Sequence, residues 1–526
     1  MNKEYGFPAI GEVAKELFAC AGFLPTKNDP LGIIRSETEK KSIQTRLRRL
    51  ANESSELRKN LDQLLSLFEK LTKETTGSER LAQAVRESIT DALEQYRDLI
   101  RTQISHLSKH DTLRFLLLTS IPERVILSYQ KNSLIFNAKA TGYQFPDDRT
   151  WWLPSFEEQQ IQWPLAKAFQ WIYETVETSQ TRFHFPNHGV HQDYRLNQNY
   201  ENAWRWTSNK RFPSLSAILT NLDESVEAMR ATENVDHERK ISPQLKNNFR
   251  TVLAIARFTT AAFRKLEKTY GREVLYAISE TLRKQDRRLR RSHKRFEENL
   301  KRKLISNNVR STQAVDIAWS LRTREFWKNR SDNLIAGAQQ LAHLQKTDSV
   351  PSEQIPKFRV YIRLLGIHGA YSVIANEAHA KKIYPPLTFV DSLQAGLRVK
   401  SHAQSPSEID TLENTIKRNG DDALGWITEW ARATHFYRKE QYSEAAPHFK
   451  RAFELGKYSA GESQYKLVNQ YIEICAKVQN WEEFKKGVAW AKYLGFSTRF
   501  LREREETEKN LRAIYEQYQL VLYPIL

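Results

Sequence analysis

The apolar residues of the first hundred positions recur in alternating steps of three and four, and this spacing constrains the fold more than any other feature. It keeps one face of a helix buried over many turns, whereas a strand alternates every two residues. One stripe runs through Leu47, Leu50, Ser54, Leu57, Leu61, Leu64, Phe68 and Leu71, and a second through Leu81, Val85, Ile89, Ala92, Tyr96 and Leu99. Residues 75–78 supply a stop and a new helix cap between them. We predict an antiparallel helical hairpin over 41–108, after a short helix at 10–23.

Composition and length bound the remaining possibilities. The chain has 526 residues, of which 40% are hydrophobic, enough for several packed domains. No apolar run approaches the ~18 residues of a membrane-spanning helix, and the first residues lack the apolar core of a secretory signal. Two cysteines exclude a disulfide scaffold and an all-cysteine zinc site. We expect an all-α, multidomain, cytoplasmic protein with no membrane partner, no metal and no cofactor.

Changes in composition predict four domains. These are an N-terminal helix plus hairpin at 1–110, an aromatic-rich region at 111–230, a basic helical domain at 231–330 and helical repeats at 331–526. In the second, 124–129 and 133–136 have the spacing of a small β-hairpin.

Two residue clusters in the aromatic-rich region raise the question of function. The aromatic residues between 151 and 206 are dense enough to stack on bases, although such residues more often form a core. His184, His188 and His191, near Asp193, have loop spacing that can bind a metal. We favour a core for the aromatic residues and a hydrogen-bonding loop for the histidines.

Residues 199–226 have the pattern of two short helices joined by a tight basic turn. Ala203 and Trp206, three residues apart, are expected to face a core. Asn209 lies where the first helix should end, and asparagine enters the left-handed conformation more readily than most non-glycine residues. After Lys210 and Arg211, a Pro-Ser pair limits the first helix and caps the next. The apolar face of the second helix comprises Leu215, Ile218, Leu222 and Val226.

This segment resembles the second half of a lambda-repressor-like (XRE) helix-turn-helix. Residues 205–214, Arg-Trp-Thr-Ser-Asn-Lys-Arg-Phe-Pro-Ser, follow that family's Arg-Trp-Glu-x-Gly-Lys-x-x-Pro-Ser, with threonine for the acid and asparagine for the glycine. The helix pair that normally precedes it is not evident in the sequence. The resemblance implies that Asn199, Asn202 and Arg205 face the major groove and that Lys210 and Arg211 contact phosphate. The alternative is an ordinary corner of an all-α protein.

Positive charge is concentrated in one block. Residues 239–330 contain 25 Lys and Arg against 8 Asp and Glu, a balance of +17 out of +18 for the chain. Within it, 271–305 is predicted to be a long helix with a narrow apolar seam at Leu275, Leu282, Leu289 and Phe296. Neighbouring like charges on a helix cost ~0.2–0.5 kcal/mol per pair, so the run indicates an external polyanion such as DNA phosphate. A solvated helix and an acidic membrane surface are the alternatives.

The densest part of this predicted helix supplies the candidate phosphate-binding cations. They are Arg283, Lys284, Arg287, Arg288, Arg290, Arg291, Lys294, Arg295, Lys301, Arg302 and Lys303. If six to eight met B-DNA phosphates, the slope of log K against log salt would be about −5 to −7.

Small and aromatic residues recur at helical spacing near the C-terminus. One set is Ala433, Phe436, Tyr442, Ala445, Phe449 and Ala452, and the second is Ile472, Cys475, Trp481, Phe484, Val488 and Ala491. The pattern resembles degenerate tetratricopeptide (TPR) repeats at 426–495, with a longer period than the usual 34 residues. Because stacked repeats need about three units, a third is expected within 331–420, and 503–526 is predicted as a capping helix. The resemblance implies a concave surface for a peptide or partner protein; the alternative is an array without a ligand.

The sequence contains no strong catalytic motif. A P-loop, a His-Glu-x-x-His motif, a paired Cys-x-x-Cys and a Gly-x-Ser-x-Gly elbow are all absent. Arg101 and His106 fit the Arg-x4–6-His spacing of HEPN-type ribonucleases, but four other pairs fit equally well. They are therefore weak catalytic candidates, and we expect a protein that is not an enzyme.

The favoured function is nucleic-acid binding, with duplex DNA before RNA. A repressor-like reader joined to a repeat array suggests a transcriptional regulator or a component of a phage-defence or mobile-element locus, by analogy of fold alone. One alternative is a helical, HEPN-like ribonuclease or defence effector. The other is a non-catalytic scaffold that assembles partners through its repeats.

Overall fold

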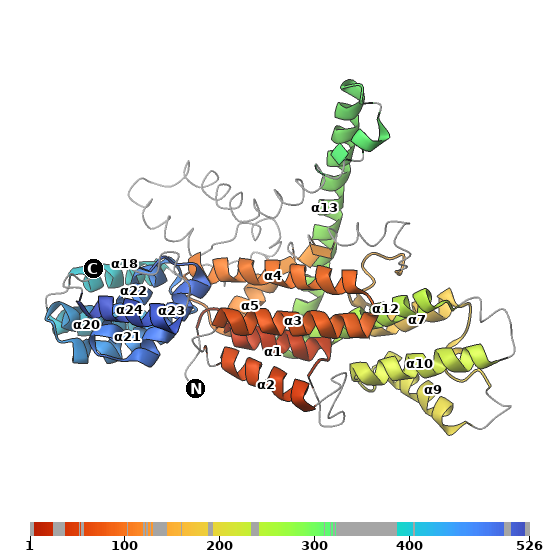
Figure 1. Cartoon of the computed structure of the whole chain (residues 1–526), viewed down its shortest axis with the longest axis horizontal. Coiled ribbons are helices and arrows are strands. Elements are labelled where there is room, and N and C mark those ends of the chain that lie inside the picture. Colours follow the sequence, from red (N-terminus) through yellow and green to blue (C-terminus); the bar gives the residue numbers. More distant parts are fainter. Residues whose placement is uncertain are drawn as a thin grey trace.

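The computed structural model of the chain is almost entirely helical (Figure 1). It describes residues 5–24, 37–51, 53, 57–102, 104–118, 121–122, 125–126, 128–129, 145–158, 160–187, 193–232, 241–309, 311–315, 317–318, 321, 387–402, 405–498 and 507–520. Over these residues the protein is all-α apart from one two-stranded ribbon, which confirms the predicted fold class. No helix in the described ranges combines the length and apolar character needed to cross a membrane.

Four helices form the N-terminal bundle: α1 (Ile10–Ala21), α2 (Glu37–Ala51), α3 (Leu57–Thr76) and α4 (Glu79–Thr102). Gly77 turns the chain between α3 and α4 with a φ of 69°, and the Ser78 hydroxyl accepts the Leu81 N–H at 3.2 Å. The two helices pair antiparallel, with Arg86 Nη1 2.7 Å from Glu69 Oε2. The hairpin is therefore present but shorter than predicted. The first leucine stripe is divided between α2 and α3, because the chain turns at Glu53, whose φ is 48°.

The central region is organised around the long helix α12 (Pro243–Tyr270). Its other elements are α5 (Lys109–Leu118), β1 (Ser155–Phe156), β2 (Ile161–Gln162), α7 (Pro164–Thr175), α8 (Gln180–His184), α9 (Tyr194–Thr207), α10 (Leu215–Ala231) and α13 (Arg272–Ser306). α12 packs against α1, α3, α7, α10 and α13. The predicted β-hairpin is wrong where it is described, since 125–126 and 128–129 are helical; 130–144 lie outside the described residues. The ribbon is formed instead by β1 and β2, with Ser155 paired to Gln162.

Most aromatic residues of the central region form a core rather than a stacking surface. Buried members are Trp151, Trp152, Trp163, Phe169, Tyr173, Phe183, Phe185 and Trp206. His184 is also fully buried, with Nε2 2.8 Å from the Tyr173 hydroxyl and Nδ1 2.9 Å from the Ser225 hydroxyl. Burial lowers the pKa of His184 to about 3. His184 is therefore a hydrogen-bonded core residue, while His188 and His191 lie outside the described residues.

Successive helical hairpins form the C-terminal array. Its helices are α18 (Leu387–His402), α19 (Pro406–Asn419), α20 (Gly425–Arg438), α21 (Tyr442–Gly456), α22 (Gln464–Lys477), α23 (Trp481–Leu494) and α24 (Glu508–Leu520), with short 3-10 turns at η3 (Asp422–Leu424) and η4 (Gly461–Ser463). A hairpin of α18 and α19 lies within the range expected for a third unit, and α24 packs on α22 and α23 at the end. The small residues Ala433, Ala445, Ala452 and Ala491 are buried between helices.

Two hydrophobic cores hold these parts together. The first joins the N-terminal bundle to the C-terminal array. At this junction Lys457 Nζ lies 2.5 Å from Glu53 Oε2, and the Ile10 N–H donates to the Tyr458 hydroxyl at 3.2 Å. The second core joins the aromatic region to α12 and the first half of α13. Segments distant in sequence therefore share apolar faces, and α12 contacts α1 and α3 of the N-terminal bundle as well as the central helices.

Candidate nucleic-acid interface

The predicted basic helix is the single helix α13, which is 35 residues long. Its first half is packed against α5 and α12, with Leu275, Ile278, Leu282 and Leu289 buried. Its far end rises out of the helical body (Figure 1). The apolar seam therefore fixes the base of α13 and leaves its distal part accessible.

The cations of α13 gather on one face. At about 100° per residue, eight cations between 284 and 302 fall within a sector of about 140°, centred opposite the buried residues. The eight are Lys284, Arg287, Arg288, Arg291, Lys294, Arg295, Lys301 and Arg302; all are exposed, and we call them the α13 basic face. At ~1.5 Å per residue this face is ~27 Å long. Glu298 is the one carboxylate in the sector between Arg283 and Lys303, so the positive field is nearly continuous.

Few of these cations are neutralised by the protein itself. Lys284, Arg287, Arg291, Lys294, Arg295 and Lys301 form no ion pair with any carboxylate of the described residues. The paired cations lie at the margin of the face: Arg283 Nη1 is 2.8 Å from Glu280 Oε1, and Arg290 Nη2 is 2.7 Å from Asp286 Oδ2. Arg283 also donates to the Pro154 carbonyl at 2.6 Å. Arg283 therefore holds the base of α13 in place rather than belonging to the α13 basic face.

The cations of the preceding helix, α12, have a different role. Lys246 and Arg250 lie 3.0 and 2.8 Å from Asp223, and Arg257 donates to the Cys20 carbonyl at 2.6 Å. Lys265 pairs with Glu16 of α1. These groups join α12 to α10 and α1. These four cations of α12 therefore connect helices within the protein, whereas the α13 basic face is exposed to solvent.

The helix-turn-helix-like corner has the predicted local structure. α9 ends at Thr207, Asn209 has a left-handed φ of 65°, and the Ser214 hydroxyl accepts the Ala217 N–H at 3.2 Å to cap α10. Ala203 and Trp206 are buried, as are the apolar residues of the α10 face. However, α9 begins at Tyr194, before the 199–226 segment that has the helix-turn-helix pattern, and the short α8 packs on it.

The three expected base-reading residues do not share one open face. Asn199 is only 7% exposed, and its Nδ2 donates to Glu224 Oε2 of α10 at 2.8 Å. Its carbonyl also accepts from Asn221 Nδ2 at 2.8 Å. Asn202 is half-buried, and Arg205 is exposed with its Nη2 3.1 Å from Glu201. Asn199 thus belongs to the contact between α9 and α10.

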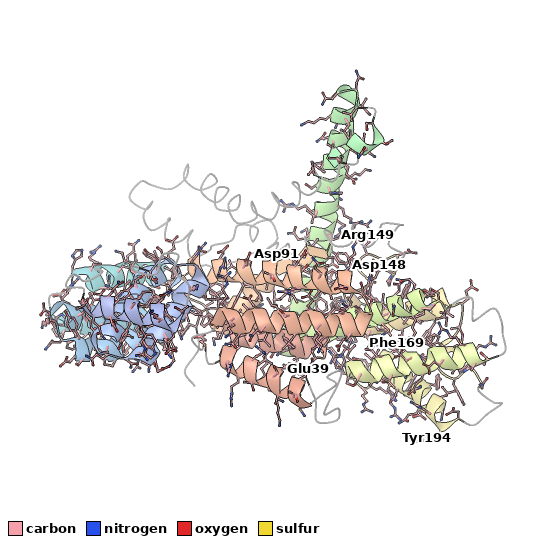
Figure 2. The ribbon with its side chains drawn as sticks, viewed as in Figure 1. Glu39, Asp91, Asp148, Arg149, Phe169 and Tyr194 are labelled. Carbon is pink, nitrogen blue, oxygen red and sulfur yellow. The ribbon has the colours of Figure 1, made fainter. Side chains whose placement is uncertain are left out.

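The basic turn is exposed, but it lies away from α13. Lys210 Nζ is 3.9 Å from the centroid of the half-exposed Trp204 ring, and Arg211 is exposed beside it. In Figure 1, α9 and α10, which this turn connects, lie at the lower right of the body, while the far end of α13 projects from the top. Figure 2 shows the same view, with Tyr194 labelled at the end of α9 opposite the turn. The expected phosphate contacts of the corner and the α13 basic face therefore do not form one continuous surface.

The weak catalytic candidates lie where the N-terminal bundle meets the array. Arg101 Nη2 is 3.0 Å from Asp98 Oδ1 at the end of α4. His106 follows the helix rather than lying on it, and its ring centroid is 5.5 Å from that of Phe389. Burial lowers the pKa of His106 to about 4, and its Nε2 is buried without a hydrogen-bond partner.

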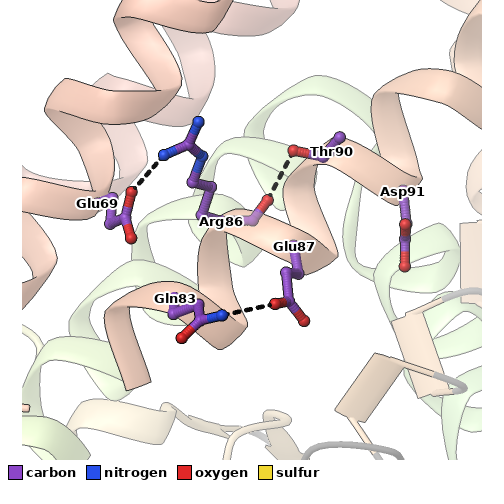
Figure 3. Close-up of a pocket in the computed structure, with 6 residues that line it drawn as sticks. All are labelled: Glu69, Gln83, Arg86, Glu87, Thr90 and Asp91. Atoms are coloured by element: carbon purple, nitrogen blue, oxygen red, sulfur yellow. Dashed lines mark hydrogen bonds and ion pairs between the residues drawn. The ribbon is translucent and has the colours of Figure 1, made fainter. Parts of the chain in front are cut away.

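An open pocket of about 460 Å³ lies between α3 and α4 (Figure 3). It is lined by Glu69, Gln83, Arg86, Glu87, Thr90 and Asp91. Its three carboxylates outweigh one guanidinium, which is unfavourable for a phosphate ligand. No group of three or more His, Cys, Asp or Glu side chains within the described ranges is arranged to hold a metal ion.

Comparisons with protein-family models, curated proteins and solved structures find no match to this chain. The arrangement of α13 therefore carries the functional argument. Residue spacing already contains the signal for its one-sided face, since 284, 288, 291, 295 and 302 follow one another in steps of four, three, four and seven. Counting charge along the sequence, without projecting it on a helix, missed this one-sidedness.

Proposed function

We propose that the protein binds nucleic acid, with duplex DNA before RNA, through the phosphate contacts of the α13 basic face. The observation that carries the proposal is a ~27 Å row of exposed cations, most of them without a carboxylate partner among the described residues. Like charges at this spacing repel one another in the free protein. Binding to a polyanion relieves this repulsion and releases the counterions of the phosphates, which favours the complex.

The geometry favours backbone contact over base reading. Lysine and arginine on an exposed ridge reach phosphates without entering a groove in a fixed register. The corner formed by α9 and α10 offers less support for base reading, since the Asn199 amide is held by Glu224. We therefore infer binding with weak sequence preference.

A sequence-reading transcriptional regulator remains a second candidate. The exposed Arg205 supports it, because arginine pairs with guanine in the major groove and a surface ion pair such as that with Glu201 exchanges at little cost. Arg205→Ala should then relax preference for one duplex sequence. If binding depends on the α13 basic face alone, this substitution leaves both affinity and preference unchanged.

A mobility-shift titration tests the proposal directly. The full chain is titrated against duplex DNA, single-stranded DNA and RNA at about 50 mM and about 200 mM salt. Six phosphate contacts predict a loss in affinity of about 10³-fold between these salt concentrations. Binding that does not respond to salt, or no binding to any nucleic acid at the lower salt, would exclude the proposal.

A further inference from the structure

Lys400, near the end of α18, is buried without a carboxylate partner among the described residues. It is 6% exposed, and its Nζ lies 4.2 Å from the centroid of the Trp430 ring on α20. Lysine is almost never fully buried unless it is paired, because its ammonium group loses hydration. Burial and the nearby charges of Lys466 and Arg438 lower the pKa of Lys400 to about 8.

The neighbouring groups add positive charge. Arg438 lies at the end of α20 and donates to the Ser401 carbonyl at 2.5 Å. Lys466 is exposed in the first turn of α22, where the helix dipole is itself positive. Neither forms an ion pair with a carboxylate of the described residues. The three cations therefore come from α18, α20 and α22, one from each of the three helical hairpins.

The internal contacts offset only part of this charge. The Trp430 ring and the carboxyl end of α18 both stabilise the Lys400 ammonium. Trp430 is itself fixed, because its Nε1 donates to Gln470 Oε1 of α22 at 2.6 Å. The buried carboxylate of α22, Glu473, accepts the Tyr437 hydroxyl at 2.6 Å. These contacts hold the walls of the site and leave a net positive field around Lys400.

We propose that Lys400, Lys466 and Arg438, which we call the array cation cluster, bind a side-chain carboxylate of an acidic peptide. The ligand class follows from access. Because Lys400 is almost covered, a carboxylate on a thin, flexible stem can reach it, whereas a duplex phosphate is held in a wide, continuous backbone. Lys466 and Arg438 are exposed and would meet further acidic residues of the same segment. The array lies at one end of the molecule and α13 rises elsewhere, so this site is separate from the proposed nucleic-acid interface (Figure 1).

Fluorescence anisotropy with a labelled eight-glutamate peptide and the full chain tests the proposal. We expect binding of this peptide, no binding of its all-glutamine counterpart, and no displacement by duplex DNA. Lys400→Met should weaken binding by about thirtyfold or more, as for the loss of one partner of a buried charge pair. Lys466→Gln removes an exposed charge and should weaken binding by about three- to fivefold, as for the loss of a surface ion pair. Lys417→Met is the matched control: it removes one charge from α19 of the same array, where Lys417 pairs with Glu413, and should change affinity less than about twofold.

Folding is separated from binding by thermal unfolding of the same variants. Lys400→Met replaces a buried charge with an apolar group of similar length, so its melting temperature should not fall. The proposal fails if both cluster variants bind the peptide like the natural chain. It also fails if duplex DNA displaces the peptide, which would place binding on α13, or if a phosphoserine peptide is strongly preferred. These outcomes do not depend on whether α13 binds nucleic acid.

Discussion

Neutralising part of the α13 basic face should reduce nucleic-acid binding by a calculable amount. The variant carries Lys284→Gln, Arg287→Gln, Arg291→Gln and Arg295→Gln, four exposed positions that form no ion pair with the described residues. They lie on one side of α13, away from its buried seam. Their replacement removes like-charge repulsion and should leave the fold intact.

The magnitude follows from counterion release. Each phosphate contact contributes a slope of about −0.9 to log K against log salt, so four lost contacts reduce the slope by about 3.6. At about 0.1 M salt the same four contacts account for a factor of about 4,000 in affinity, or ~5 kcal/mol. The natural chain, with six contacts, should show a slope of about −5, and the variant about −2.

Fluorescence anisotropy with a labelled duplex of about 20 base pairs, repeated over a range of salt, measures both quantities. A matched variant, Lys41→Gln, Arg58→Gln, Arg418→Gln and Lys509→Gln, removes the same charge from exposed sites on α2, α3, α19 and α24. It should retain the steep slope and most of the affinity. Equal losses in the two variants would show that net charge, and not the α13 basic face, governs binding, and the reasoning would be refuted.

Three further perturbations test the rest of the structure. Acidification should destabilise the protein, because burial lowers the pKa of His184 to about 3 and that of His106 to about 4, below the unfolded value of 6.5. The unfolded state therefore binds more protons than the folded state as the pH falls below ~6.5. Each histidine should lower the free energy of unfolding by ~2 kcal/mol between pH 7 and pH 5. Urea midpoints that coincide at the two pH values would contradict this. Asn209→Ala should lower the free energy of unfolding by ~1 kcal/mol, whereas Asn209→Gly should not, because φ is 65° there; thermal unfolding compares the two. Lys457→Ala should cost ~3 kcal/mol in urea unfolding, because the part-buried Glu53 carboxylate would lose its cation and keep only the hydrogen bond from the Tyr458 hydroxyl; a loss below ~1 kcal/mol would show that the junction does not depend on this ion pair.

Local sequence signals predicted the helices and one corner well. The left-handed Asn209 and the Ser214 cap depend on residues within one turn of chain, so their chemistry determines the outcome. The long basic helix was also predictable, because its apolar seam recurs regularly. The repeat-like hairpins follow from small residues that recur where helices approach closely.

Features that depend on distant contacts could not be predicted in this way. Val125 and Ile126 favour a strand locally but are helical, with Ile126 buried in the second core. Asn199 was expected to be open to solvent, yet its environment is set by Glu224 and Asn221 of the following helix. The array cation cluster gives no sequence signal, since its members lie on three different helices.

The shared core of the N-terminal bundle and the C-terminal array has a consequence for biosynthesis. The Ile10 N–H and the Tyr458 hydroxyl that accepts it are 448 positions apart. At ~5–20 residues per second, a ribosome needs ~20–90 s to make the intervening chain. During that time the apolar faces of the first helices lack the C-terminal residues that cover them in the folded protein. The residues of the second core lie between these two parts of the sequence and can pack as soon as they are synthesised. The nascent protein should therefore mature from the middle outward and depend on a chaperone until its last helices emerge.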